Sequence, residues 1–124
     1  MTVKAPPRFD TDAYKRAYER WDLEALLGFY ADDVELVQID RDNPPSAPRV
    51  RRGKDVFKGM FEHCAAAGVK ATVENTVAGD DRAAVTVSCE FPGGRRVVAN
   101  TILELVDGRI ACERDVVAGD RKTD

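Results

Sequence analysis

The second half of this 124-residue chain alternates apolar and polar residues, and this alternation restricts the fold more than any other feature. After Gly68, four such segments follow one another (69–78, 82–91, 95–106 and 109–117), separated by the short turn sequences GDD, PGG and DG. A period of two residues is typical of strands, and short turns join strands that run antiparallel. The sequence therefore predicts a meander of four antiparallel strands.

The first half of the chain has helical spacing in two segments that precede a first strand. One helix is expected from Asp10 or Thr11 to about Arg20, and a second begins after Asp22, a residue that caps helices well. A strand is expected over 33–40, followed by a proline-containing loop over 41–53. The apolar stripes are Tyr14, Ala17, Tyr18 and Trp21 in the first helix and Leu23, Leu26, Leu27 and Tyr30 in the second.

A third helix is expected over 54–67, where five apolar residues recur at helical spacing: Val56, Phe57, Met60, Phe61 and Cys64. The chain is interpreted as one α+β domain over 10–119, with three helices on one face of a curved, mostly antiparallel sheet. Residues 1–9 are expected to form a flexible arm, and 120–124 a flexible tail. The expected core is Leu26, Leu27, Phe57, Phe61, Val85, Val87 and Leu103.

The composition favours a soluble globular protein that acts without nucleic acid or membrane. A net charge of -3 provides no basic surface for either partner. No apolar run resembles a secretion signal or a membrane span, so a cytoplasmic location is expected. Three separated cysteines and one histidine, His63, favour neither a disulfide framework nor a metal site, and no cofactor is expected.

Four sequence segments, in this order, carry a resemblance: DLEALLGFYADDVEL at 22–36, RRGKDVFKGMF at 51–61, VTVSCEFPGGRRVVA at 85–99 and ELVDGRI at 104–110. Over residues 10–119 the chain resembles the nuclear-transport-factor-2-like superfamily, and within it the ketosteroid isomerase and SnoaL-like polyketide cyclase groups. The resemblance implies a cone-shaped α+β barrel, of the cystatin-like type, whose helices and sheet enclose one apolar pocket.

The same resemblance aligns three family positions with residues of this chain. Tyr14 stands where the family has an oxyanion tyrosine, but the position of the family base is occupied by Gln38, whose amide cannot abstract a proton. The position of the second oxyanion acid falls on Thr101 or on Ile102, and neither is an acid. Steroid isomerisation by the family mechanism is therefore not expected.

Two aspartates remain as candidate bases. Asp40 ends the first strand on the same parity as Gln38, where it either reaches the pocket or is solvated beside Arg41. Asp115 shares its parity with Glu113 and Val117, and the resemblance directs this parity toward the pocket. The opposite parity carries slightly more apolar residues and would leave Asp115 on the surface. A carboxyl group in an apolar pocket has a raised pKa, which suits proton transfer near neutral pH.

Two functional hypotheses follow. The first is a cofactor-independent enzyme of the isomerase, cyclase or dehydratase type, in which Asp115 or Asp40 moves a proton of a small apolar carbonyl compound while Tyr14 polarises its oxygen. The second is a non-catalytic module that binds an apolar ligand or associates as a dimer. The expected ligand-binding wall is Gln38, Tyr18, Phe57, Phe61, Cys89, Thr101 and Val117.

The outer face of the sheet predicts the oligomeric state. Its alternating positions mix apolar and uncharged polar groups, and a solvated face usually carries more lysine. A homodimer is expected through this face, with Ile102 near its centre. The positions are Thr86, Ser88, Glu90, Asn100, Ile102 and Glu104.

Overall fold

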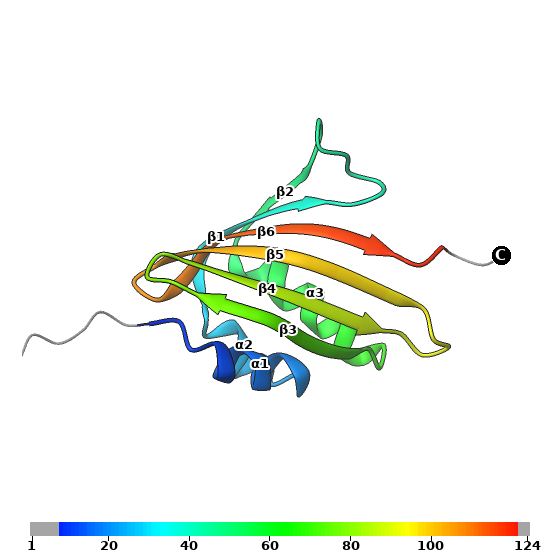
Figure 1. Ribbon diagram of the computed structural model, residues 1–124, viewed down its shortest axis with the longest axis horizontal. Helices are drawn as coiled ribbons and strands as arrows, with labels where there is room; N and C mark the ends of the chain where they lie inside the picture. The colour runs from blue at the N-terminus through cyan, green and yellow to red at the C-terminus, as the bar shows by residue number, and fades with distance from the viewer. Residues whose placement is uncertain (1–7, 122–124) are drawn as a thin grey trace, which may run out of the picture.

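The two residue spacings of the sequence produce two layers, as Figure 1 shows. The structure, a computed structural model, describes residues 8–121. Three helices, α1 (Thr11–Glu19), α2 (Leu23–Leu27) and α3 (Lys54–Ala66), pack on one face of a curved sheet. The predicted α+β class is confirmed. The strands are β1 (Tyr30–Ile39), β2 (Arg49–Arg52), β3 (Lys70–Ala78), β4 (Arg82–Glu90), β5 (Arg96–Val106) and β6 (Arg109–Gly119).

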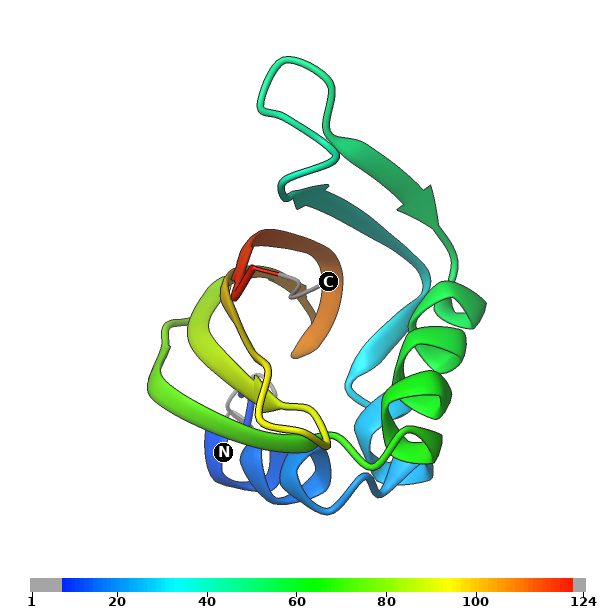
Figure 2. The same cartoon turned by 90° about the vertical axis from the view of Figure 1, so that its right-hand side faces the viewer.

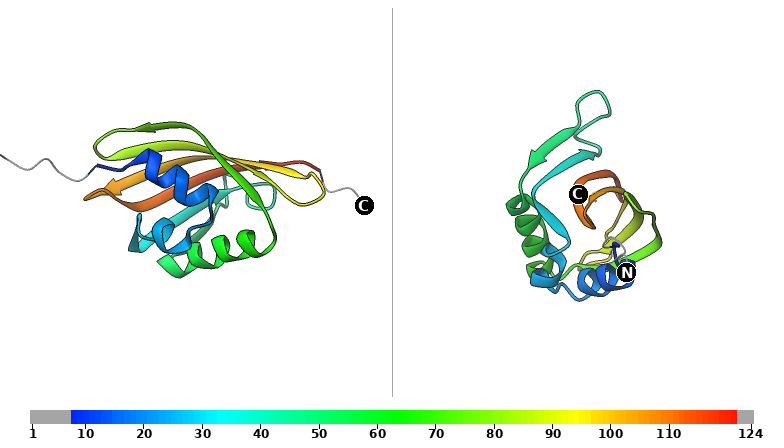
Figure 3. Two further views of the ribbon diagram at one scale, coloured as in Figure 1. Left: turned by 90° about the horizontal axis from the view of Figure 1, so that it is seen from below. Right: turned by 90° about the vertical axis from the view of Figure 1, so that its left-hand side faces the viewer.

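The six strands form one sheet in the order β2-β1-β6-β5-β4-β3. Strands β3 to β6 make the predicted antiparallel meander, and β1 joins β6 in parallel. The sheet curls without closing, so β2 and β3 remain its two edges. Figure 2 shows α3 along one side of the curl and α1 with α2 beneath it. Figure 3 shows from below how these helices cross the concave face.

The predicted starts of the first two helices are confirmed, but the end of the second is not. Asp10 and Asp22 are the N-caps, and each accepts a hydrogen bond from the backbone N–H three residues later. The second helix ends at Leu27, and Tyr30, predicted on its apolar stripe, is the first residue of β1. Tyrosine is a good strand residue, and Gly28 ends the helical spacing before it.

The loop predicted over 41–53 contains a short strand. Residues Arg49–Arg52 pair antiparallel with β1, and the Arg52 guanidinium lies 2.7 Å from the Glu35 carboxylate. All four strand residues are exposed, so no alternation of buried and exposed positions marks them in the sequence. An edge strand with charged side chains is protected from pairing with other chains.

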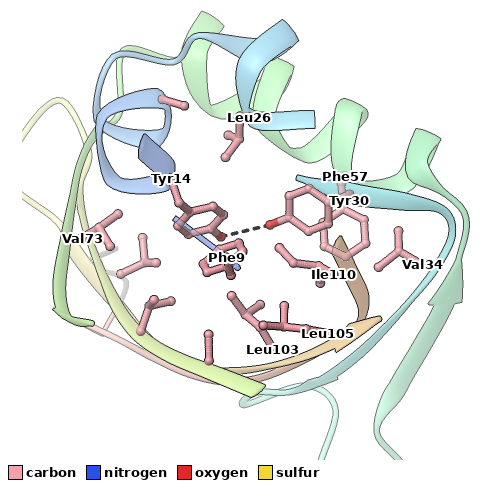
Figure 4. Close-up of a cluster of buried hydrophobic side chains, with 14 of the residues drawn as sticks. Phe9, Tyr14, Leu26, Tyr30, Val34, Phe57, Val73, Leu103, Leu105 and Ile110 are labelled. Atoms are coloured by element: carbon pink, nitrogen blue, oxygen red, sulfur yellow. Dashed lines mark hydrogen bonds between the residues drawn. The ribbon is translucent and has the colours of Figure 1, made fainter. Parts of the chain in front are cut away.

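The core lies between the helices and the concave face of the sheet, as Figure 4 shows. All predicted core residues are buried except Leu27, which is half-buried at the margin of α2. Phe9, which the sequence assigns to the N-terminal arm, is buried, and its ring centroid lies 5.1 Å from that of Tyr14. The remainder of the predicted arm and most of the predicted tail, 1–7 and 122–124, lie outside the described residues.

Candidate functional site

A chamber with a volume of about 110 Å³ lies on the concave face, between α1, α3 and the sheet. Its apolar wall comes from Met60, Val87, Cys89, Val97, Ala99 and Val117. Its polar lining comes from Tyr14, Tyr18, Gln38, Thr101, Glu113 and Asp115. Most residues predicted as ligand-binding therefore line one cavity. Phe57 and Phe61 do not, because they pack in the core beneath it, with the Phe57 ring centroid 4.6 Å from that of Tyr30.

A bulge in β6 determines which side chains reach this chamber. Leu105 pairs with Ile110 and Glu104 pairs with Cys112, so Ala111 has no partner on β5. An unpaired residue reverses the alternation of the strand beyond it. Ile110, Glu113 and Asp115 are consequently all buried, although strict alternation places Ile110 on the face opposite to the two acids. The face of β6 that carries Asp115 points toward the chamber, as the resemblance indicates.

Thr101 and Ile102 lie on opposite faces of β5, so only one of them reaches the chamber. Thr101 is buried and its hydroxyl donates to Asp115 Oδ1 at 2.9 Å, whereas the Ile102 side chain is 43% exposed on the outer face. Gln38 lies beside Asp115 in the parallel register of β1 and β6 and is half-buried. The amide of Gln38 thus adjoins a carboxylate from a different strand.

A chain of hydrogen bonds connects the aromatic and acidic lining. The hydroxyl oxygens of Tyr14 and Tyr30 are 3.0 Å apart, as the dashed line in Figure 4 marks, and the Tyr30 hydroxyl donates to Glu113 Oε1 at 2.8 Å. Because Tyr30 has one hydroxyl hydrogen and gives it to Glu113, Tyr14 is the donor to Tyr30. The hydrogen bonds therefore all point in one direction, from Tyr14 in α1 through Tyr30 in β1 to Glu113 in β6.

The two carboxyl groups of β6 have raised pKa values. Burial raises the pKa of Glu113 well above its ordinary value, and the charge of Asp115 and a hydrogen bond with it act in the same direction. Burial also raises the pKa of Asp115, while hydrogen bonds from Glu113 and Thr101 act against the rise. Two adjacent buried carboxylates cannot both be ionised without a large repulsion. Because the pKa of Glu113 is raised further above its ordinary value, Glu113 is the member of the pair that keeps its proton to the higher pH.

Asp40 lies away from this acid pair, in the turn that follows β1. Its Oδ1 accepts hydrogen bonds from the backbone N–H groups of Asp42 and Asn43 and from the Asn43 side chain, each at 2.9 Å. The Asn43 side chain is the largest cause of a lowered pKa for Asp40. A carboxylate with a lowered pKa is a weak base, and the three hydrogen bonds to Oδ1 make Asp40 a turn residue.

Asp40 instead borders a second, more open hollow of about 660 Å³ at the mouth of the cone. Val97 and Val117 line both this hollow and the chamber, so the two spaces adjoin. The mouth is surrounded by the turn after β1, the start of β5 and the end of β6, on the side of the molecule that faces the viewer in Figure 2. The site thus has an inner chamber with an acid pair and an outer mouth with several charged groups.

The cysteines and possible metal ligands add no second centre. Burial raises the pKa of Cys89 to about 11, so its thiol is a poor nucleophile at neutral pH. Within residues 8–121, no three side chains of the histidine, cysteine, aspartate or glutamate type gather in a way that could hold a metal ion. No helix in this described part is long and apolar enough to cross a membrane.

Sequence reasoning missed two members of the site, Glu113 and Tyr30. Glu113 shares the strand parity of Asp115, and that signal was sufficient to include it once Asp115 was chosen. The sequence predicts Tyr30 as a helix residue because it extends the stripe of Leu23, Leu26 and Leu27. Its side chain nevertheless joins Tyr14 to Glu113.

The α+β cone with its curved sheet is the fold of the nuclear-transport-factor-2-like class. Residues 11–113 match the model of the SnoaL-like domain, and the chain belongs to that family. No curated protein matches the sequence. The expected family resemblance is confirmed.

Solved structures share the fold at low sequence identity. A candidate ketosteroid isomerase from Kribbella flavida is 19% identical, with a TM-score of 0.69, over 91% of this chain and 78% of that one. A candidate polyketide cyclase from Pseudomonas putida is 21% identical, with a TM-score of 0.63, over 84% of this chain and 85% of that one. A computationally designed binder of 17-OHP is 21% identical, with a TM-score of 0.61, over 89% of this chain and 95% of that one.

Proposed function

We propose that the protein catalyses cofactor-free proton transfer on a small carbonyl compound whose reacting end is apolar. The observation that carries this proposal is the acid pair Glu113 and Asp115, buried together in a chamber that is otherwise largely apolar. Buried acids that share a proton are expensive to maintain for stability alone, and perturbed carboxyl groups in a cavity are typical of acid–base sites. The related folds named as isomerase and polyketide cyclase agree with this reaction class.

Asp115 is the proposed base and Tyr14 the proposed oxyanion donor. The carboxylate of Asp115 has a raised pKa, so it accepts a carbon-bound proton more readily than an ordinary aspartate does. Tyr14 would turn its O–H from Tyr30 to the carbonyl oxygen as negative charge develops there. A donor of this kind contributes about 3 kcal/mol to transition-state stabilisation in comparable sites. Glu113, holding its proton, fixes the orientation of Asp115.

The size of the chamber limits what reacts there. A cavity of about 150 Å³ accommodates a molecule the size of benzene, and this chamber is somewhat smaller, at about 110 Å³. The reacting end of the substrate is therefore no larger than a small ring or a short acyl group. The rest of a larger substrate extends past Val97 and Val117 into the mouth.

The test is exchange of α-deuterium from deuterated butan-2-one into water, followed by nuclear magnetic resonance. The wild-type protein should accelerate the exchange, and Asp115→Asn should reduce the acceleration by about 100-fold or more, within the usual range for general bases. Asp40→Asn is the matched control, because an asparagine retains the turn acceptor. Loss of exchange in Asp40→Asn with retention in Asp115→Asn would reverse the assignment of the base.

A second candidate function is binding of an apolar ligand without catalysis. The observation that favours it is the position of Tyr14, which is 1% exposed and already hydrogen-bonded to Tyr30. The designed 17-OHP binder has a similar fold, so such a cone also serves as a binding scaffold. Saturable binding of butan-2-one without deuterium exchange would favour this alternative.

We also propose that the protein is a homodimer through the outer face of the sheet. Val98, Ile102 and Val116 are 39%, 43% and 56% exposed on that face. Ile102 and Val116 border a largely apolar hollow of about 460 Å³ that is also lined by Val37 and Ile39. Exposed apolar surface of this kind, rimmed by polar side chains, is typical of association sites.

A further inference from the structure

We propose that the mouth of the cone binds a carboxylate through Arg95, so that the substrate is a keto acid with its carbonyl in the chamber and its carboxylate at the mouth. This inference rests on the proposed function and specifies its substrate class. Arg95 directly precedes β5 and lines the outer hollow together with Val97 and Val117. Its residue number has the same parity as Val97, Ala99 and Thr101, which all line the chamber.

The guanidinium of Arg95 has unused hydrogen-bonding capacity. Its Nε is buried and has no partner, and within residues 8–121 no carboxylate lies within ion-pair distance of the Arg95 side chain. A buried N–H without an acceptor costs free energy, and no hydrogen bond from Nε ties the guanidinium to the described part of the protein. The planar guanidinium also matches the two oxygens of a carboxylate.

Two neighbours hold this guanidinium over the mouth. The ring of Phe91 lies beneath it, with the ring centroid 5.6 Å from the guanidinium carbon. On the other side is Gly119, where an added Cβ would come within 3.3 Å of Arg95 Nη2 and 3.2 Å of Val97 Cγ2. The missing side chain at position 119 therefore leaves the space that the guanidinium occupies.

The carboxylates around the mouth are engaged with other groups or with solvent. Asp40 accepts the three hydrogen bonds of its turn, and Asp120 accepts the backbone N–H of Arg96 at 3.0 Å. Asp42 is exposed to solvent, as is the second cation, Arg41. The unpaired, partly buried charge at the mouth is thus the positive charge of Arg95. The nearby aspartates would repel a doubly charged phosphate more strongly than a singly charged carboxylate.

The register of the sheet gives the length of the ligand. Val97 pairs with Gly119 and Thr101 pairs with Asp115, so the guanidinium beside Gly119 lies four strand residues from the proposed base. Four residues of strand span about 13 Å. Allowing for one contact at each end, the carbonyl and carboxylate carbons of the ligand are separated by roughly 5 to 7 bonds. A linear compound of this type is 7-oxooctanoate.

The experiment compares 7-oxooctanoate with its neutral amide, 7-oxooctanamide, by isothermal titration calorimetry. Wild-type protein should bind the carboxylate about tenfold or more tightly, in keeping with the strength of hydrogen bonds to charged groups. Arg95→Gln should abolish this preference, and Gly119→Ala should reduce it by displacing the guanidinium. Arg96→Gln is the matched control, because that neighbouring arginine is exposed and lies near Glu90, 4.0 Å away. It should retain the preference.

The outcomes separate this inference from the proposed reaction. Equal affinities for the two compounds in wild type, no binding of the carboxylate, or a preference retained in Arg95→Gln would overturn the inference. Asp115→Asn should keep the preference for the carboxylate, because it leaves Arg95 intact. Carboxylate-selective binding without any deuterium exchange would reject the proposed catalysis and leave the assignment of Arg95 standing. Thermal unfolding of each variant establishes that it is folded, and a folded variant decides the question either way.

Discussion

Glu113 and Asp115 lie two residues apart on one strand, and both are buried at 6% exposure. Burial of a charge is costly unless hydrogen bonds compensate for it. Here Tyr30 donates to Glu113 and Thr101 donates to Asp115, and the two acids are themselves hydrogen-bonded. These contacts allow the pair to carry one negative charge inside the protein. They do not support a second one.

Replacement of Glu113 by a side chain that does not titrate should weaken the pH dependence of stability. The folded pKa of Glu113 is raised above the unfolded value of about 4.3. The folded state therefore binds more protons, and stability falls as the pH rises from the unfolded pKa toward the folded one. In Glu113→Gln, the amide imitates the protonated acid and does not titrate. Urea unfolding between pH 5 and pH 8 should show a smaller loss of stability in the variant, and equal slopes would contradict the assignment.

Tyr30 should contribute more to stability than the other tyrosines of the site, because its hydroxyl has two buried partners. Tyr30→Phe removes the donor to Glu113 and the acceptor for Tyr14, at an expected cost of about 1–3 kcal/mol. Tyr18→Phe is the control, since no side-chain hydrogen bond involves the Tyr18 hydroxyl in the described part of the chain. Chemical denaturation measures both variants. A Tyr18→Phe loss as large as that of Tyr30→Phe would argue against the hydrogen-bond chain.

At the scale of elements, α2 has one fully buried side chain, with Leu23 and Leu27 packed against the margin of the core. A helix of five residues is not stable by itself, and Leu26 is the only residue of α2 that is buried. Leu26→Ala should therefore lower the free energy of unfolding by about 2–5 kcal/mol. Leu27→Ala is the matched control, because Leu27 is half-buried, and its loss should be clearly smaller. Urea unfolding that ranks the two variants in the opposite order would show that α2 packs differently.

The sequence predicts elements well where burial produces a regular spacing and poorly where local pairing interrupts it. The meander of β3 to β6 and the starts of α1 and α2 follow from alternation and from the capping aspartates. The bulge at Ala111 is not predictable from the sequence, because it arises from a mismatch between β5 and β6 that no local pattern shows. Strand β2 was missed for a related reason, since its arginines are all exposed and pair only at the sheet edge.

The candidate site was also predictable only in part. Tyr14, Thr101 and Asp115 were chosen from family positions, and all three line the chamber. Glu113 is indicated by the strand parity that it shares with Asp115, whereas the part played by Tyr30 depends on the three-dimensional packing, which the sequence does not display. Arg95 depends on an absent side chain at Gly119 and on an unpaired nitrogen, and only the packed structure reveals those.

At the scale of the whole molecule, the curl of the sheet separates two faces of different character. The concave face holds the chamber and the mouth, whereas the convex face presents apolar side chains that no helix within residues 8–121 covers. Thr101 and Ile102 are adjacent in β5 and belong to opposite faces. A dimer formed through the convex face would therefore brace the strands that carry Thr101 and Asp115 without entering the pocket.

This arrangement predicts that a charge at the centre of the convex face dissociates the dimer and leaves the chamber unchanged. Ile102→Glu places a carboxylate on the apolar surface formed with Val98 and Val116, and burying an unpaired charge in an interface is strongly unfavourable. Val50→Glu is the matched control, because Val50 is 54% exposed on the edge strand β2. Light scattering at micromolar concentration should give a dimer for wild type and Val50→Glu and a monomer for Ile102→Glu. A monomeric wild-type protein, or a dimeric Ile102→Glu variant, would exclude this face as the interface.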